Sequence, residues 1–391
     1  MKQGWEIKKL GEICNKITNI KWNEIDKTTS FPYIDLSAVD RENSSIHDYE
    51  YINISNAPSR AKQIVKVGDI LFATTRPMLK RACIIPNEFN NAIASTGFCV
   101  LRPQGIVLSE WIYHNIKSNR FYKYIEPIQK GVSYPAVTDN EVKDFCIPVP
   151  PREEQERIVE ELDCLSGVIE KKREQLKQLD ALAQSIFYQM FGDPITNEKG
   201  WKVKKLGEVC NKITDGTHNS PKSFPSGVYM YVTAKNIKKD GFDLSNITYV
   251  SEDVHKSIYS RCNPVFGDIL YIKDGATTGI AMINSLKEEF SLLSSVALLK
   301  CNYDMVSNIF IKEVLNSTSK YNEIRGNMGG AAITRLTINK IENIYIPLPP
   351  LALQQEFADK IEAIEKQKEL IKKSISETET LFNARMDYYF N

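Results

Sequence analysis

Apolar residues recur along two stretches of the chain at alternating spacings of four and three residues. Such spacing, kept over four to five heptads, is typical of α-helices that pair in a coiled coil. The first stretch has Ile158, Leu162, Leu165, Ile169, Lys172, Leu176, Leu179, Ala183, Ile186 and Met190 at these positions. The second has Phe357, Ile361, Ile364, Lys368, Ile371, Ile375, Thr378 and Phe382. The pattern predicts one coiled-coil helix over residues 152–192 and another over residues 351–391.

The two predicted helices are expected to pair with each other in antiparallel orientation. A helix of about 35 residues is roughly 50 Å long, and a globular region precedes each helix, so the second helix must run back along the first. Lys172 and Lys368 interrupt the apolar positions. We expect their stems to lie along the seam and their ammonium groups to extend towards Glu174, Glu365 or Glu369.

The regions before the helices, residues 1–151 and 193–350, form a first lobe and a second lobe with a mixed pattern. Short β-rich runs bounded by Gly, Pro and Asn predict strands at residues 31–39, 70–74, 97–101, 229–233, 269–272 and 296–299. Amphipathic spacing predicts one helix over residues 111–128 and one over residues 309–324. Each lobe is therefore predicted to be α+β, with one twisted mixed or antiparallel sheet.

The two halves of the chain repeat one another. Residues 4–18 and 200–214 are identical at 12 of 15 positions. Gly-Asp-Ile-Leu at 68–71 and Ile-Pro-x-Pro-Pro at 147–151 both recur 199 residues later. A period near 200 is that of a domain, so the chain is predicted to be a pseudo-two-fold object. Duplex DNA and symmetric oligomers are partners that suit such an object.

Composition indicates an ordinary globular protein with room for two cores: of 391 residues, 42% are hydrophobic and 25% charged. No apolar run approaches the roughly 18 residues of a membrane helix, and we infer a cytoplasmic protein. The net charge of +1 is unevenly distributed along the chain, because residues 1–151 carry +3 and residues 200–350 carry +4. Any attraction to phosphate is therefore expected in the lobes.

The chain lacks the motifs of the common enzyme and metal sites. We find no phosphate-binding loop, dinucleotide fingerprint, amino-methyltransferase motif or nuclease core. The eight cysteines form no Cys-x-x-Cys pair, which predicts reduced core residues and no metal. Of the four histidines, His47, His114 and His255 are expected to be solvated or hydrogen-bonded, and His218 stands out because it follows Thr214-Asp215-Gly216-Thr217.

Several motifs together resemble the specificity subunit of type I restriction-modification enzymes, over essentially the whole chain. They are the two copies of Gly-Trp-x-x-x-x-Leu-Gly-Glu, the segments 214–218, 68–71 and 267–270, the run 274–279, and the doubled Ile-Pro-x-Pro-Pro before a Gln-bearing coiled coil. One departure is Arg152, where the second copy has the more usual Leu351.

The resemblance implies an α+β fold with two similar globular target-recognition domains, separated by a long antiparallel two-helix coiled coil in a pseudo-two-fold repeat. It implies that each domain reads one half of a split sequence in double-stranded DNA. It also implies a non-catalytic chain that docks two modification (methyltransferase) subunits and the ATP-dependent restriction subunits. AdoMet, ATP and Mg are then expected in those partners, and no cofactor in this chain.

In the first lobe, basic and hydroxyl side chains beside the predicted strand 70–74 are candidates for DNA contact, because Arg is suited to bidentate contacts with guanine or phosphate. The loop before the last predicted strand is a second candidate, because recognition concentrates in loops on a rigid scaffold. The first-lobe candidates are Thr74, Thr75, Arg76, Lys80, Arg81, Lys130, Ser133 and Tyr134.

The second lobe has candidates at equivalent places. Its loop 273–279 is rich in Gly and hydroxyls, which lets the backbone approach a sugar-phosphate chain, and loop 327–332 precedes the last strand. The second-lobe candidates are Thr217, His218, Lys273, Thr277, Thr278 and Asn327. Subunit docking is assigned to the heptad residues Ile158, Leu162, Leu165, Ile169, Leu176, Leu179, Phe357, Ile361, Ile364, Ile371 and Ile375.

Two other classes of protein stay open at this point. One is a coiled-coil protein-interaction scaffold, or an orphan specificity chain without active partners. The other is a self-sufficient nucleic-acid enzyme, which the missing motifs disfavour. Basic lobes with unequal loops favour DNA recognition.

Overall fold

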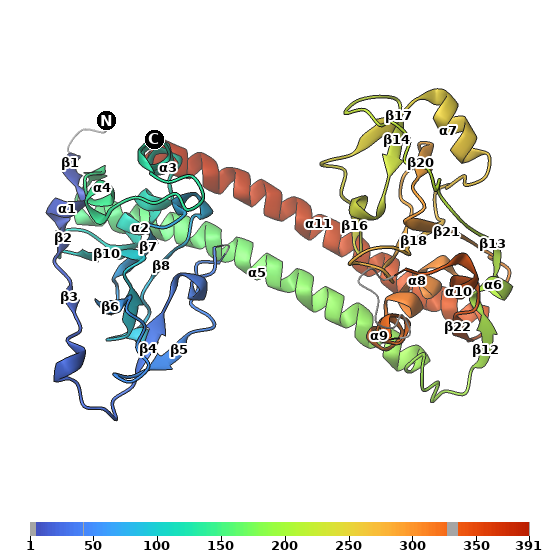
Figure 1. Cartoon of the computed structure of the whole chain (residues 1–391), viewed down its shortest axis with the longest axis horizontal. Coiled ribbons are helices and arrows are strands. Elements are labelled where there is room, and N and C mark those ends of the chain that lie inside the picture. The colour runs from blue at the N-terminus through green and yellow to red at the C-terminus, as the bar shows by residue number, and fades with distance from the viewer. Residues whose placement is uncertain (1–4, 42, 327–334, 391) are drawn as a thin grey trace. The chain divides into compact units, whose positions relative to one another are not determined.

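The computed structural model describes residues 5–41, 43–326 and 335–390. The chain divides into two compact units: residues 1–173 with 373–391, and residues 174–372. Two long helices, α5 (Arg152–Phe191) and α11 (Leu351–Phe390), contribute to both units. Each unit therefore contains one lobe and part of each long helix (Figure 1).

The strands of the first lobe form three sheets. An antiparallel sheet has the order β2-β10-β7-β8, and a mixed sheet has the order β3-β6-β9-β4-β5, in which β4 and β9 are parallel. A third sheet pairs β1 with β11. The bounds are β1 Glu6–Lys9, β2 Cys14–Asn15, β3 Thr18–Asn19, β4 Phe31–Ile34, β5 Glu50–Ile52, β6 Ala61–Ile64, β7 Ile70–Ala73, β8 Ala82–Ile84, β9 Ile93–Ser95, β10 Phe98–Pro103 and β11 Cys146–Val149.

The second lobe repeats the antiparallel sheet as β13-β21-β18-β19 and the terminal pair as β12 with β22. Its sheet β17-β14-β20 repeats the β5-β4-β9 part of the mixed sheet, with β14 and β20 parallel, and β15 and β16 form a further pair. The bounds are β12 Lys202–Lys205, β13 Cys210–Asp215, β14 Tyr229–Val232, β15 Ile237–Lys238, β16 Gly241–Phe242, β17 Thr248–Val250, β18 Ile269–Ile272, β19 Ala281–Ile283, β20 Phe290–Leu292, β21 Val296–Cys301 and β22 Tyr345–Leu348. The α+β class is confirmed, and the prediction of a single sheet in each lobe is wrong.

The helix predicted in each lobe is two helices. Ser118 and Ser317 interrupt the helical pattern in extended conformation, and their hydroxyls donate to the last turn of the preceding helix, at Asn115 O (2.6 Å) and Val314 O (2.7 Å). The first-lobe helices are α1 Leu10–Ile13, α2 Ser109–Lys117, α3 Asn119–Ile125 and α4 Asp139–Lys143. The second-lobe helices are α6 Leu206–Val209, α7 Glu252–Tyr259, α8 Asn308–Asn316, α9 Thr318–Gly326 and α10 Ile338–Glu342.

Aromatic side chains join each lobe to the long helices. In the first unit, Trp111 of α2 packs against Phe390 near the end of α11, with ring centroids 4.9 Å apart. In the second unit, Phe310 of α8 packs against Phe191 near the end of α5, at 4.8 Å. Aromatic pairs at such distances contribute beyond the area they bury, so the helix ends share one hydrophobic cluster with the adjoining part of each lobe.

A buried glutamine ties the start of each long helix to its lobe. Gln155 accepts from Leu108 N (2.9 Å) and donates to Pro150 O (2.9 Å). Gln354 accepts from Ser307 N (3.0 Å) and donates to Pro349 O (2.9 Å). The departure at Arg152 therefore does not change how the helix starts, because both copies make the same contacts.

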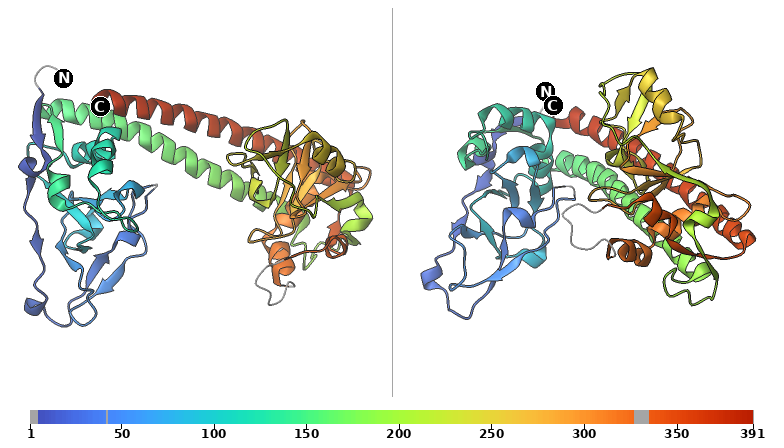
Figure 2. Two further views of the ribbon diagram at one scale, coloured as in Figure 1. Left: turned by 45° about the horizontal axis from the view of Figure 1, so that its top comes forward. Right: turned by 45° about the vertical axis from the view of Figure 1, so that its right-hand side comes forward.

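Within each unit α5 and α11 run antiparallel. Figure 2 shows the start of α5 beside the end of α11 in the first unit, and the end of α5 beside the start of α11 in the second. The ion pairs between the helices are Glu161 with Arg385, Arg173 with Glu379 (2.7 Å) and Asp180 with Lys368 (2.7 Å). The partner's number falls along α11 as the number rises along α5, which confirms the predicted orientation.

The two lysines in the seam find different partners. Lys368 is buried and reaches Glu365 (2.9 Å), as predicted, and also Asp180, which was not. Lys172 donates to the hydroxyls of Ser374 (2.5 Å) and Thr378 (3.4 Å) of α11, so the prediction of a glutamate partner was wrong for this residue. Ser374 and Thr378 make the seam locally polar.

The heptad residues named for docking face the partner helix or the lobes. Leu165, Leu176, Leu179 and Ile371 are half-buried, and the other seven are buried. None of the eight cysteines is in a disulfide, and Cys164 is exposed on α5, so the prediction that every cysteine is a core residue was wrong there. Within the described ranges, no helix is long and apolar enough to cross a membrane.

Candidate nucleic-acid interface

Two loops of the first lobe that are distant in sequence lie together. Loop A comprises residues 74–81, after β7, and loop B comprises residues 130–136, before α4. Loop B closes on itself through two bonds between Lys130 and Ala136, both 2.9 Å, and pairs with loop A through an antiparallel bridge between Thr75 and Ala136. Arg76 N donates to Pro135 O (2.6 Å). A recognition surface built from both loops is thus held by backbone bonds.

Arg76 and Tyr134 form the exposed tip of this surface. Arg76 Cζ lies 4.5 Å from the centroid of the Tyr134 ring, and Nη2 donates to Ser133 O (3.4 Å). Tyr134 is 68% exposed and the neighbouring Val132 fully exposed. A guanidinium on an aromatic face keeps a defined plane and several free N–H donors, which suits bidentate contact with a base or phosphate.

The other first-lobe candidates divide into exposed and structural residues. Lys80 is exposed, and Lys130 is exposed with Glu141 3.4 Å away. Thr75 is half-buried in the bridge between the loops. Thr74 is buried and donates to Gly97 O (2.8 Å), and half-buried Arg81 donates to Leu36 O. The structure leaves Thr74 little surface for DNA, which argues against its assignment as a DNA contact. The assignment of Arg81 stays a prediction.

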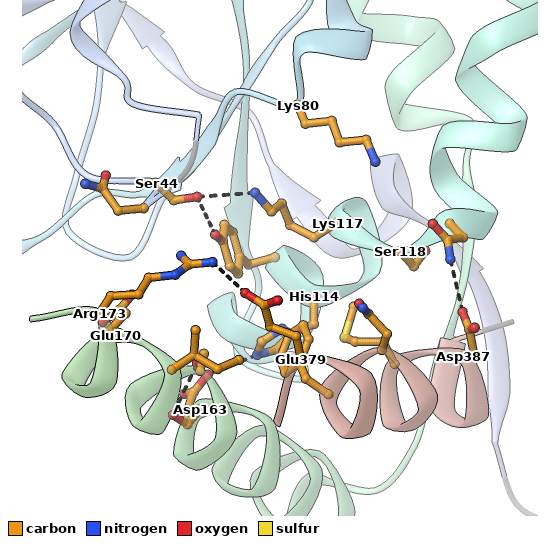
Figure 3. Close-up of a pocket in the computed structure, with 18 residues that line it drawn as sticks. Ser44, Lys80, His114, Lys117, Ser118, Asp163, Glu170, Arg173, Glu379 and Asp387 are labelled. Atoms are coloured by element: carbon orange, nitrogen blue, oxygen red, sulfur yellow. Dashed lines mark hydrogen bonds and ion pairs between the residues drawn. The ribbon is translucent and has the colours of Figure 1, made fainter. Parts of the chain in front are cut away.

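A cavity of about 500 Å³ lies between the first lobe and the long helices of the same unit (Figure 3). Lys80 of loop A and Lys117 of α2 line its lobe side, where Lys117 Nζ donates to Ser44 Oγ (3.3 Å). Burial lowers the pKa of Lys117, and the nearby charge of Lys80 lowers it further. The lobe side of the cavity thus presents two lysines, whereas Asp163, Glu170 and Glu379 line its helix side.

The second lobe pairs its loops in the same way. Leu336 N donates to Lys273 O (2.8 Å), as Val137 N donates to Thr74 O (3.0 Å) in the first lobe. Asp274 and Arg335 form the bridge that corresponds to Thr75 and Ala136. One scaffold therefore presents two loops in each lobe, with different side chains on them.

The second-lobe candidates also divide. Thr277 is exposed, whereas Thr278 is buried and donates to Gly275 O (2.7 Å). Lys273 is only 2% exposed, so neither Thr278 nor Lys273 can reach DNA as predicted. Thr217 is half-buried and bridges to Leu293. Asn327 lies outside the described residues.

Lys273 belongs to a network of charges around Asp215. The buried carboxylate of Asp215 lies 3.3 Å from Lys273 Nζ, 3.2 Å from Arg261 Nη1 and 3.2 Å from His218 Nε2. Asp274 adds contacts with Lys273 Nζ at 3.6 Å and Arg335 Nε at 3.3 Å. Two carboxylates thus hold three permanent cations in one cluster.

Arg261 and Arg335 are the residues that sequence reasoning missed. Their side chains are 50% and 57% exposed, so part of each guanidinium faces solvent while the rest is held by a carboxylate. Arg335 lies three positions after the end of the loop 327–332 and could have been found from that position. Arg261, after α7, carries no local signal, because it joins the site through contact with residues 46 positions away.

A duplicated α+β lobe, a two-helix coiled coil and arginine-bearing loops in both lobes define a two-domain DNA-recognition protein. Residues 2–180 and 198–380 each match the type I restriction modification DNA specificity domain, and the chain belongs to this family. The resemblance seen in the sequence is thereby confirmed.

Relatives with similar sequences are specificity subunits. The type I restriction enzyme MjaIX specificity subunit of Methanocaldococcus jannaschii is 27% identical over 341 residues, which are 79% of this chain and 76% of the relative. The putative MjaX specificity subunit of the same organism is 23% identical over 396 residues, covering 95% and 91%.

Solved structures cover the whole chain. One, from a study of complex assembly and conformational transition of the type I R-M system, has a TM-score of 0.62, is 26% identical, and matches 100% of this chain and 98% of that one. The S subunit from M. genitalium has a TM-score of 0.58 and covers 99% and 96%; at 14% identity it shows the fold alone.

Proposed function

We propose that this chain reads a bipartite target in double-stranded DNA, one half-site with each lobe, as the specificity subunit of a type I restriction-modification complex. The observation that carries the proposal is the shared pairing of two loops in both lobes, with different cations on or beside these loops. Arg76 on Tyr134 serves the first lobe, and Arg261 and Arg335 serve the second. One scaffold with two sets of side chains suits two different half-site sequences.

The charges support DNA over a protein partner for these loops. Arg76, Lys80 and Lys130 are exposed on the first lobe, which carries a net +3. Contacts to phosphate release counterions, so affinity should fall steeply with salt. Family membership favours this function over a coiled-coil scaffold that binds only protein.

Catalysis belongs to partner subunits in this proposal. The family is defined by DNA specificity, so we assign this chain the role of placing modification and restriction subunits on DNA. Two modification subunits match the two-fold repeat, with AdoMet, ATP and Mg held by the partners. Exposed apolar residues on the long helices, Leu370 (69%) and Leu381 (51%), offer surface for docking. Because such a complex would act on DNA inside the cell, we propose a cytoplasmic location.

Exchange of one lobe tests the proposal. Residues 15–145 are replaced by the same region of a relative with a different target, and methylated positions are mapped in DNA from cells that also carry the partner subunits. We expect one half of the target to change while the other half and the spacer stay the same. A change in both halves, or methylation without a defined target, would contradict independent reading by the lobes.

A further inference from the structure

We propose that Asp215 is a positioning residue for sequence recognition: it orients Arg261 directly, and orients Arg335 through Lys273 and the loop that follows. The inference rests on the proposed function and deepens it, because it says how the second lobe fixes its readers.

The carboxylate of Asp215 acts as a hub inside the lobe. It is 4% exposed and contacts the side chains of Lys273, Arg261 and His218, of which only Lys273 is buried with it. One buried lysine is sufficient to neutralise one buried carboxylate. The additional contact with the half-exposed Arg261 therefore does more than balance charge.

Arg261 is fixed at two points. Nη1 lies 3.2 Å from Asp215, and Nη2 donates to Gly216 O. Gly216 has no freedom to move away, because a Cβ there would lie 1.9 Å from Leu292 O. Clamping one edge of a guanidinium sets its plane, and bidentate contact with a base depends on that plane.

Arg335 connects to the same hub through the backbone. Lys273 is held by Asp215, and its carbonyl accepts from Leu336 N (2.8 Å), next to Arg335. Asp274, one residue after Lys273, contacts Arg335 Nε. Loss of the Asp215 carboxylate should therefore disturb both arginines.

The first lobe lacks this arrangement. In the aligned sequence Asn19 and Thr74 fall opposite Asp215 and Lys273, so both charges are absent at these positions. The strand that holds Asn19 also pairs differently, with β6, whereas Asp215 pairs with β21. The first lobe is an internal control, because a change at Asp215 should leave its half-site unaffected.

Electrostatics gives the test a definite sign. A carboxylate near DNA repels phosphate, so removing it should leave non-specific binding unchanged or tighter. If Asp215 positions the arginines, its removal should instead weaken recognition of the bases in the second half-site. The two effects are separated by the specificity ratio, which is the affinity for the mapped target divided by that for a duplex substituted in one half-site.

The experiment measures this ratio for the partner-loaded complex with wild-type chain, Asp215→Asn, and the double variant Asp215→Asn/Lys273→Met. The double variant removes both buried charges, so it avoids an unpaired lysine and should fold. Asp304→Asn makes the same charge change at an exposed second-lobe residue. For both Asp215 variants we expect the second half-site ratio to fall about 5- to 150-fold, as for one lost bidentate contact. The first half-site ratio and the Asp304 variant should match wild type.

Two results would overturn the inference. One is a wild-type ratio in the folded Asp215→Asn variant. The other is full recovery in the double variant, because Asp215 would then only neutralise Lys273. Failure of the proposed function looks different: the wild-type complex itself would show no preference at either half-site.

Discussion

Replacing Arg76 by alanine is the most direct perturbation of the first half-site. The guanidinium is exposed, lies on the Tyr134 ring and makes one long bond to Ser133 O. Its removal therefore costs the fold little and removes most of the hydrogen-bonding capacity at the tip of the two loops. We expect the folded complex to assemble normally and to bind its target more weakly.

The size of the effect follows from the contacts. One bidentate contact to a base discriminates by about 1–3 kcal/mol, so Arg76→Ala should weaken cognate binding by roughly 5- to 150-fold. Tyr134→Ala keeps the charge but releases the side chain, and ordering it on binding costs about 0.5–1.5 kcal/mol. The tyrosine variant should thus lose roughly 2- to 12-fold.

Fluorescence anisotropy with the partner-loaded complex measures these values on the mapped duplex and on duplexes substituted at single base pairs. Arg76→Lys separates two modes of contact, because lysine can pair with phosphate but cannot reproduce a bidentate fork. Arg152→Ala serves as control, since Arg152 is an exposed arginine at the start of α5, bonded to Glu156. It should bind as wild type.

The reasoning would be refuted by a particular pattern of coupling. If the loss caused by Arg76→Ala is the same on every substituted duplex, the residue does not report on any base of the first half-site. If the loss persists on duplexes substituted in the first half-site and disappears on those substituted in the second, the assignment of lobes to half-sites is reversed.

Two further predictions concern stability. Gly216→Ala should destabilise the second lobe by about 3 kcal/mol or more, because its Cβ would overlap the backbone at Leu292 O. Gly167→Ala in α5 has open space around the added methyl group and should stabilise the protein by about 1 kcal/mol. Thermal denaturation measures both changes, and an unchanged stability of Gly216→Ala would contradict the close approach. Hydrogen bonds from Arg385 and then Tyr389 lower the pKa of Glu161, so the stability from this contact should be complete above the usual Glu value of about 4.3 and lost as pH falls through the lower folded value. Arg385→Ala should flatten this acid limb of the unfolding profile relative to wild type, and unchanged curves would argue against the pair.

The sequence predicted the repeated architecture because its signals are periodic. Heptad positions such as Ile158 and Phe357 depend on local spacing, and the antiparallel pairing of the helices followed from chain order alone. The division of strands among several sheets was not predictable, because pairings such as β4 with β9 join residues about 60 positions apart. Ser118 and Ser317 were missed for a different reason: a serine in an amphipathic run is compatible with continuing a helix or with interrupting it.

The sequence predicted which loops form the candidate site better than it predicted which side chains are exposed there. Arg76, Lys80 and Tyr134 are in exposed loops that the sequence marked. Lys273 was expected to supply charge to DNA because it begins the Gly- and hydroxyl-rich loop 273–279, and only the tertiary position of Asp215 accounts for its burial. Arg261 joined the site through the same carboxylate, which no local pattern revealed.

The polar contacts of Lys368 and Lys172 have a consequence for how the long helices align. A slip of one heptad would move Lys368 from Asp180 to the neighbourhood of Phe187, which is buried among aromatic rings. An ammonium group stranded there would cost several kcal/mol. Lys172 would likewise leave the hydroxyls of Ser374 and Thr378. The two lysines thus fix the register of the two helices. An insertion in one helix would be tolerated only with a matching insertion in the other.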